Sequence, residues 1–208
     1  MARDTGPNCR QCRREGMKLF LKGIKCTTEK CPFVRRQYAP GQHGQKRSKL
    51  SNYAQQLREK QKVKRIYGLM EKQFRTYFLK ASKSKGVTGK MLLQLLERRL
   101  DNVIFQMRLA TSRQEARQIV NHGFVYVNGQ RVNVPSFLVK TQDSIELKLK
   151  QKNLKNIKEN IEVSQQRSVP SWLEVDFENF KGKVIRLPER EDIQLPIREQ
   201  LIVELYSK

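Results

Sequence analysis

The chain has 208 residues, enough for one large or two small domains, and 43 Lys and Arg residues against 20 Asp and Glu residues give a formal net charge of +23. Self-repulsion at this charge opposes a compact state, so the composition favours a polyanionic partner, with nucleic acid ahead of an acidic membrane surface. No apolar run approaches the roughly 20 residues that span a bilayer, and the N-terminus lacks the apolar core of a signal peptide. We therefore expect a cytoplasmic protein with no membrane partner.

Residues 1–45 are interrupted by Gly and Pro and contain all four cysteines, namely Cys9, Cys12, Cys26 and Cys31. Two close pairs separated by thirteen residues are typical of a four-thiolate zinc site that is structural and closed. An iron–sulfur cluster uses the same ligands and remains an alternative, as do disulfides or free thiols. Neighbouring Arg and Lys residues are expected to lower the pKa values of the thiols. His43 is expected to lie near phosphate or to be structural, rather than to replace a ligand.

Residues 46–98 are predicted to form a basic helical domain. Apolar residues at helical spacing predict helices from Leu50 to Gly68, from Met70 to Ala81, and after Thr88. Residues 1–100 hold 26 basic and 6 acidic residues, and Glu59 is the one acid between positions 44 and 66. Because a solvated helix face would carry acids for i,i+4 pairs, this run predicts phosphate contacts. The predicted contacting residues are Lys46, Arg47, Lys49, Arg58, Lys60, Lys62, Lys64 and Arg65.

Residues 99–162 are predicted to form a compact α+β module. Asp101 is expected to cap a short helix, and the capping box of Ser112 and Glu115 opens a second helix that ends at Gly123. The pair Asn128-Gly129 between β-type runs predicts a hairpin, and further strands are expected at 137–139 and 144–149.

The outward face of the second helix of this module is a second candidate phosphate surface. Arg113 and Arg117 are four positions apart and therefore one turn apart, and each guanidinium can make a bidentate contact with phosphate. The residues predicted on this face are Arg113, Gln114, Arg117 and Asn121.

Residues 163–208 are nearly neutral, with 7 basic and 8 acidic residues. Runs at 172–175, 183–186 and 201–205 predict short C-terminal strands that pack on the helical domain, and Trp172 is expected in the core. The predicted fold class is therefore α+β: an irregular zinc-bound N-terminal segment, a small helical domain, a compact α+β RNA-binding module and short C-terminal strands.

Several motifs together resemble the bacterial small-subunit ribosomal protein four family over essentially the whole chain. They are CRQCRREG at 9–16, YAPGQHG at 38–44, LREKQK at 57–62, LERRLDNV at 96–103, SRQEAR at 112–117, VNG at 127–129 and LIVELYS at 201–207. The resemblance implies a primary binder of small-subunit ribosomal RNA that nucleates assembly of the subunit body. It also implies a role in translational accuracy at a contact with protein five, and a position beside protein three. The cysteines look like the zinc-binding version of this family.

Two positions depart from the family pattern and concern the geometry of the module surface. Gln142 stands before Asp143 where family members often have Gly, and Phe124 stands where a second histidine often follows His122-Gly123.

Two other functions share some of these features. An RNA-modifying enzyme would need a nucleophile or an acid–base pair in a pocket, and the sequence has no phosphate-binding loop, no Ser-His-Asp pattern and 2 histidines. We therefore predict no enzymatic activity and no small-molecule substrate. A soluble RNA-binding regulator would wash off ribosomal subunits in high salt, whereas a structural protein would remain bound.

Overall fold

The computed structural model describes residues 4, 6–46, 49–148, 151–164 and 167–207, and the chain divides into two compact units. The helical unit comprises Met1–Leu92 and Leu195–Lys208, and the sheet unit comprises Leu93–Gln194. The boundary falls inside helix α5 (Thr88–Glu97). No helix within the described parts of the chain is long and apolar enough to cross a membrane.

The predicted helices of the helical unit are confirmed. Helix α3 (Asn52–Ile66) begins after Ser51, whose hydroxyl accepts the backbone N–H of Ala54 at 3.2 Å. It ends before Gly68, which adopts a φ of +63° that disfavours any other residue. Helix α4 (Glu71–Lys83) buries four residues of its predicted apolar stripe, namely Phe74, Tyr77, Phe78 and Ala81. Met70, the fifth predicted member, precedes the helix and is exposed.

The N-terminal segment contains short helical pieces rather than only irregular chain. These are α1 (Asn8–Glu15), the 3-10 helix η1 (Gly23–Cys26) and α2 (Pro32–Arg35). Gly16 ends α1 at a φ of +66°. The pieces are too short for a 3.6-residue period to be read from the sequence.

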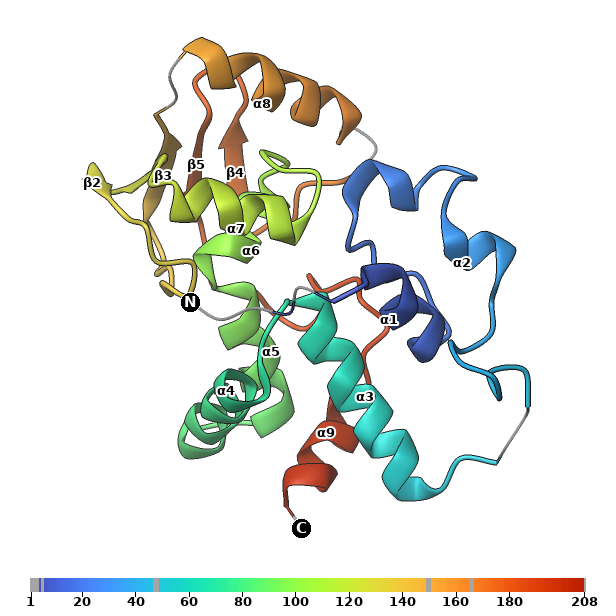
Figure 1. Cartoon of the computed structure of the whole chain (residues 1–208). Helices are drawn as coiled ribbons and strands as arrows, with labels where there is room; N and C mark the ends of the chain where they lie inside the picture. The colour runs from blue at the N-terminus through green and yellow to red at the C-terminus, as the bar shows by residue number, and fades with distance from the viewer. Residues whose placement is uncertain (1–3, 5, 47–48, 149–150, 165–166, 208) are drawn as a thin grey trace. The chain divides into compact units, whose positions relative to one another are not determined.

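The prediction of a strand at 201–205 is wrong, because this run lies in helix α9 (Glu199–Tyr206). Figure 1 shows α9 beside α3 within the helical unit. Ile202 is fully buried, and Gln56 of α3 donates a side-chain hydrogen bond to Glu204 at 2.9 Å. A run of five residues has no readable period, so the packing partner decides between helix and strand.

In the sheet unit, α6 (Leu100–Gln106) and α7 (Arg113–Asn121) confirm the two predicted helices, and Figure 1 shows them side by side. Ser112 accepts the N–H of Glu115 at 3.2 Å as expected. Glu115 does not return to Ser112; its carboxylate accepts from the backbone and hydroxyl of Thr111 at 2.8 and 2.6 Å. Asp101 is not the cap of α6, because Arg99 holds that position and Asp101 lies buried in the first turn.

The sheet has five antiparallel strands in the order β2-β1-β3-β5-β4. The predicted hairpin joins β1 (Val125–Val127) to β2 (Gln130–Arg131), and Asn128 and Gly129 have the positive φ values, 49° and 79°, of a type I′ turn. The expected strand at 137–139 is reduced to an isolated bridge between Leu138 and Arg99. The next expected strand is β3 (Ser144–Leu147), and position 149 of that prediction lies outside the described residues.

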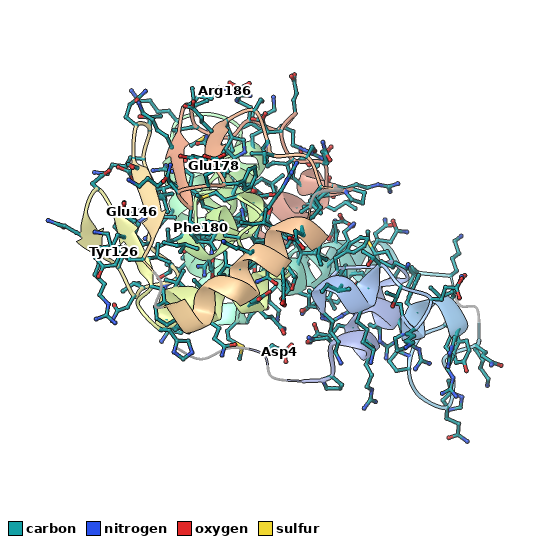
Figure 2. All side chains as sticks on the ribbon, turned by 90° about the horizontal axis from the view of Figure 1, so that it is seen from above. Asp4, Tyr126, Glu146, Glu178, Phe180 and Arg186 are labelled. Atoms are coloured by element: carbon teal, nitrogen blue, oxygen red, sulfur yellow. The ribbon has the colours of Figure 1, made fainter. Side chains whose placement is uncertain are left out.

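The C-terminal strands belong to the sheet of the sheet unit, which corrects the prediction for residues 163–208. Strands β4 (Leu173–Asp176) and β5 (Lys181–Val184) continue the sheet, with Ile145 of β3 opposite Gly182 of β5. The open edge of β3 carries backbone groups that need partners, and β5 supplies them. Figure 2 shows Tyr126 and Glu146 near one another on neighbouring strands β1 and β3.

The core of the sheet unit gathers side chains from both sides of the predicted boundary at 162. Trp172 is 1% exposed, which confirms it as a core residue. Helix α8 (Gln151–Val163) was not among the predicted elements, yet Ile157 of this helix belongs to the same core.

Candidate nucleic-acid interface

The arginines of α3 are held by a buried acid from α1. Arg58 lies 3.3 Å from the carboxylate of Glu15, and Arg65 contacts the same oxygen. The side chain of Glu15 is 2% exposed. Burial raises the pKa of Glu15, and the positive charges of Arg58 and Arg65 oppose that shift.

The lysines of α3 pair with a second acid, at the start of α4. Lys60 and Lys64 lie 2.7 and 3.1 Å from the carboxylate of Glu71, which also accepts a hydrogen bond from Tyr206 at 2.9 Å. Burial alone would raise the pKa of Glu71, but these three hydrogen bonds lower it to about 2. Burial, together with the same carboxylate, raises the pKa of Tyr206.

The premise that α3 lacks acidic partners is therefore wrong. Glu15 precedes Arg58 by 43 positions and Glu71 follows Lys60 by 11, so the i,i+4 rule could not find either acid. Lys62 pairs with Glu59 at 2.6 Å and also donates to the carbonyl of Pro196 at 2.7 Å.

The predicted residues of this run differ in solvent exposure. Lys60 is 6% exposed and cannot lie on an open surface. Lys46 and Lys49 are exposed, and Arg47 lies outside the described residues. The other four predicted residues are half-buried, namely Arg58, Lys62, Lys64 and Arg65. Their contact with RNA stays a prediction.

The four residues predicted on the outward face of α7 differ in how far they are buried. Arg113 is half-buried, its Nε donates to the Asn102 side-chain oxygen at 2.8 Å, and its guanidinium lies 4.5 Å from the centre of the Phe105 ring. Gln114 is half-buried and Asn121 is exposed.

Arg117 is 4% exposed, so the expectation that it faces outward is wrong. Its guanidinium lies 3.3 Å from the carboxylate of Asp101, which also contacts Arg99 at 2.6 Å. A buried carboxylate is the counter-charge that a buried guanidinium needs, and the spacing of Arg113 and Arg117 alone does not reveal it.

Arg108 and Arg167 lie outside the predicted set, and the charges of Arg108 and Arg113 both act on Arg167. Arg108 follows α6 and adopts a φ of +63°, and Arg167 shares the ring of Phe105 with Arg113. The loop position of Arg108 between two predicted helices was a usable signal. Arg167 had no local signal, because only the tertiary fold brings it to this position.

The four cysteines line one small cavity together with Asn8, Leu21, Lys22 and Phe33. All four are free thiols; Cys9 is half-buried and the other three are buried. Burial raises the pKa values of Cys12 and Cys26, so the expected lowering by nearby basic residues does not dominate for these two thiols.

Two further observations bear on this cavity as a metal site. The backbone N–H of Lys22 donates to the sulfur of Cys26 at 3.3 Å, and a backbone hydrogen bond from Leu19 reaches Cys12. Among the described residues, no three His, Cys, Asp or Glu side chains are arranged so that they could already hold a metal ion. His43 is exposed in the loop that follows α2.

Comparison with known families matches two parts of the chain. The description "Ribosomal protein S4/S9 N-terminal domain" matches residues 3–97, and the description "S4 domain" matches residues 98–145. Over 208 residues and 100% of both chains, the sequence is 62% identical to small ribosomal subunit protein uS4 of Thermodesulfovibrio yellowstonii. It is 60% identical, over the same length and coverage, to the proteins of that name from Thermoanaerobacter pseudethanolicus and Dictyoglomus thermophilum.

Proposed function

The chain belongs to the small ribosomal subunit protein uS4 family, and on that premise we propose how its residues serve the function of the family. The protein is a structural constituent of the small ribosomal subunit that binds ribosomal RNA, it is not an enzyme, and it resides on the cytoplasmic ribosome. The single observation that carries this conclusion is identity of about 60% to uS4 proteins over the full length of both chains.

We propose that the accessible basic and amide side chains of the two predicted surfaces contact the RNA backbone. In the helical unit these are the basic residues Lys46, Lys49, Arg58, Lys62, Lys64 and Arg65, and in the sheet unit they are Arg113 and the amides Gln114 and Asn121. The support is the net charge of +23 together with their partial exposure. Lys60 and Arg117 are buried and so do not contact RNA directly. Instead, Lys60 pairs with Glu71 and Arg117 pairs with Asp101 to support the fold beneath these surfaces.

The salt dependence of RNA affinity tests this assignment. The double variant Lys62→Gln/Lys64→Gln should flatten the slope of log K against log salt by about 0.7–0.9 for each phosphate contact that is lost. The matched control is Lys60→Gln on the same helix, which removes one buried positive charge and should leave the slope unchanged. An unaltered slope in the double variant would mean that these lysines serve only their ion pairs.

We also propose that the protein is a primary RNA binder that nucleates assembly of the subunit body and contributes to translational accuracy. Its expected neighbours are small-subunit proteins five and three. The support is the resemblance in the seven motifs given above. Order-of-addition reconstitution tests the first part: subunits assembled without this chain should stall at an early intermediate, and adding it first should restore assembly.

A structural zinc ion held by Cys9, Cys12, Cys26 and Cys31 is the cofactor we propose. The thiols share one cavity, and the N–H groups directed at two of the sulfurs would stabilise thiolates. Binding requires the thiol side chains to turn toward a common centre. A four-thiolate site has no open position, so the ion would stabilise the short helices of this segment, and structural zinc contributes about 10–16 kcal/mol of apparent binding free energy in small metallo-domains.

Elemental analysis of the purified chain decides between zinc and the iron–sulfur alternative. We expect about one zinc per chain for a single four-ligand site, and its loss in Cys31→Ser. The control His43→Ala should retain the metal, since His43 is not a proposed ligand. Iron together with visible absorbance would replace zinc by a cluster, and the absence of both metals would contradict the site.

A further inference from the structure

Three arginines of the sheet unit gather around aromatic rings beside the start of α7. The guanidinium groups of Arg113 and Arg167 lie 4.5 and 4.3 Å from the centre of the Phe105 ring. Arg108 lies 5.7 Å from the ring centre of Phe177, and its charge lowers the pKa of Arg167. We call Arg108, Arg113 and Arg167 the arginine cluster.

Glu115 offsets only part of the positive charge of this cluster. Its charge raises the pKa of Arg167, and its carboxylate oxygens accept hydrogen bonds from Thr111 and from Asn160, the latter at 2.7 Å. One carboxylate cannot balance three guanidinium groups. Arg167 itself donates to two neutral oxygens, the carbonyl of Ala110 at 2.9 Å and the hydroxyl of Ser164 at 2.8 Å.

Arg108 has a donor that the protein does not satisfy. Its Nε is buried and has no hydrogen-bond partner among the described residues. The residue also holds a φ of +63°, a conformation that costs free energy for a side chain other than Gly. A buried, unsatisfied donor on a cation is costly unless a ligand completes it.

The electrostatics of the arginine cluster favour the binding of an anion. Burial first, and then the charges of Arg113 and Arg108, lower the pKa of Arg167 to about 10, so it still carries its proton at neutral pH. Arg167 therefore stays charged in a partly buried place beside two further guanidinium groups. A perturbed pKa beside specific charged neighbours is a feature of candidate binding sites.

We infer that Arg108, Arg113 and Arg167 form one site for phosphate groups of the ribosomal RNA backbone. Guanidinium groups present planar forks of N–H donors to phosphate, and stacking on Phe105 holds two of them in place before the RNA arrives. Arg113 is positioned further by Asn102, whose amide donates to the carboxylate of the buried Glu97 at 2.6 Å. This inference rests on the proposed RNA-binding function and adds to it Arg167, which lies outside the S4 domain match at 98–145.

The test measures RNA affinity and stability in the same variants. The probe is small-subunit ribosomal RNA transcribed in vitro, titrated with wild type, Arg108→Gln and Arg167→Gln over a range of salt concentrations. Each variant should weaken binding and flatten the salt slope by about 0.7–0.9 per lost phosphate contact. Without RNA, Arg108→Gln should melt at or above the temperature of the wild type, because it removes a positive charge and a buried donor without a partner among the described residues. Arg167→Gln also removes two hydrogen bonds, so the salt slope is its deciding readout.

The matched control is Arg186→Gln, which removes the same charge from the same unit. Arg186 already pairs with Asp192 at 2.7 Å, so this control should leave the salt slope unchanged. Figure 2 labels Arg186 in the sheet unit. The double variant Arg108→Gln/Arg167→Gln should lose less than the sum of the two single effects if both arginines contact the same phosphate.

A purely structural role predicts the opposite pattern. If Arg108→Gln and Arg167→Gln lower the melting temperature and leave the salt slope unchanged, the cluster only stacks on the rings and the inference is overturned. Should a Gln variant fail to fold, Arg167→Lys keeps the charge and should keep the slope while weakening affinity, because Lys cannot make a bidentate contact; unchanged affinity would also overturn it. If the wild type itself ignores the RNA, the proposed RNA-binding function fails as well, so the two failures are distinguishable.

Discussion

Arg99 and Arg117 are both buried in the sheet unit, and the carboxylate of Asp101 lies between them at 2.6 and 3.3 Å. Asp101 is itself buried, so its charge and theirs are removed from water together. Breaking such a group by removing one partner is far more costly than the net value of the pair, because uncompensated charge remains in the interior.

The variant Asp101→Asn should therefore lower the free energy of unfolding by about 3–5 kcal/mol. Urea denaturation followed by circular dichroism measures the change. The control Glu178→Gln removes one exposed carboxylate from the same unit and should stay within about 0.5 kcal/mol of wild type. A loss below about 1 kcal/mol in Asp101→Asn would show that water, rather than Asp101, compensates the two arginines.

Gln142 occupies a turn position whose backbone conformation Gly would adopt at lower cost. Its φ is +69°, in the left-handed region that side chains rarely adopt. Asp143 still accepts the N–H of Lys140 at 2.7 Å and the amide of Asn128 at 2.9 Å. The turn is kept by these hydrogen bonds, and the strained backbone remains.

At the scale of elements, α3 is joined to α1, α4 and α9 through its charged residues. Glu71 at the start of α4 gathers Lys60, Lys64 and Tyr206, and so connects three helices. Because these hydrogen bonds lower its pKa from 4.5 to about 2, Glu71 stabilises the folded state when it is ionised. The contribution is fully present above about pH 4.5 and is lost as the pH falls toward 2.

The pH dependence of stability should reveal this contribution. Between pH 6 and pH 2.5 (about the window set by that shift), the free energy of unfolding of wild type should fall further than that of Glu71→Gln. The extra loss should be about 1 kcal/mol, since the carboxylate is half-exposed and solvent screens its charge. Urea unfolding midpoints across this range measure the difference. The control Glu174→Gln on β4 is exposed and should follow wild type. Equal pH profiles for wild type and Glu71→Gln would contradict the assignment.

At the scale of the whole molecule, each unit has its own apolar core. The sheet unit buries Trp172, the single tryptophan of the sequence. The buried residues of the helical unit include Val63, Phe74 and Ile202 of α9. Tryptophan fluorescence therefore reports on the sheet unit, and helical circular dichroism reports strongly on the helical unit. Separate cores are what allow parts of a chain to unfold as separate units.

The variant Ile202→Ala should destabilise the helical unit by about 2–5 kcal/mol, because it leaves a cavity at a fully buried position. Its helical signal should melt at a lower temperature while the fluorescence transition of Trp172 stays near that of wild type. Leu173→Ala on β4 serves as the reciprocal control and should shift the fluorescence transition first. If Ile202→Ala moves both transitions together, the two units unfold as one.

The candidate site could be predicted only in part. Burial on α7 separates Arg117 from Arg113, and no spacing rule shows which of two arginines one turn apart meets a buried acid. The four cysteines could be grouped from spacing alone, and they do line one cavity. The arginine cluster could not be found, because Arg113 and Arg167 are 54 positions apart in the sequence.

The sequence by itself determined the features that depend on neighbours along the chain: the presence of α3 and its end before Gly68, the cap of Ser112 on α7, and the turn at Asn128-Gly129. Local hydrogen bonds and allowed φ values act over a few residues, so their signals are local as well. Only the tertiary structure decided that 201–205 is a helix, that β4 and β5 extend the sheet, and that Glu15 and Glu71 hold the cations of α3. Those outcomes depend on which distant surface is available for pairing and burial, and a residue carries no record of that surface in its immediate sequence.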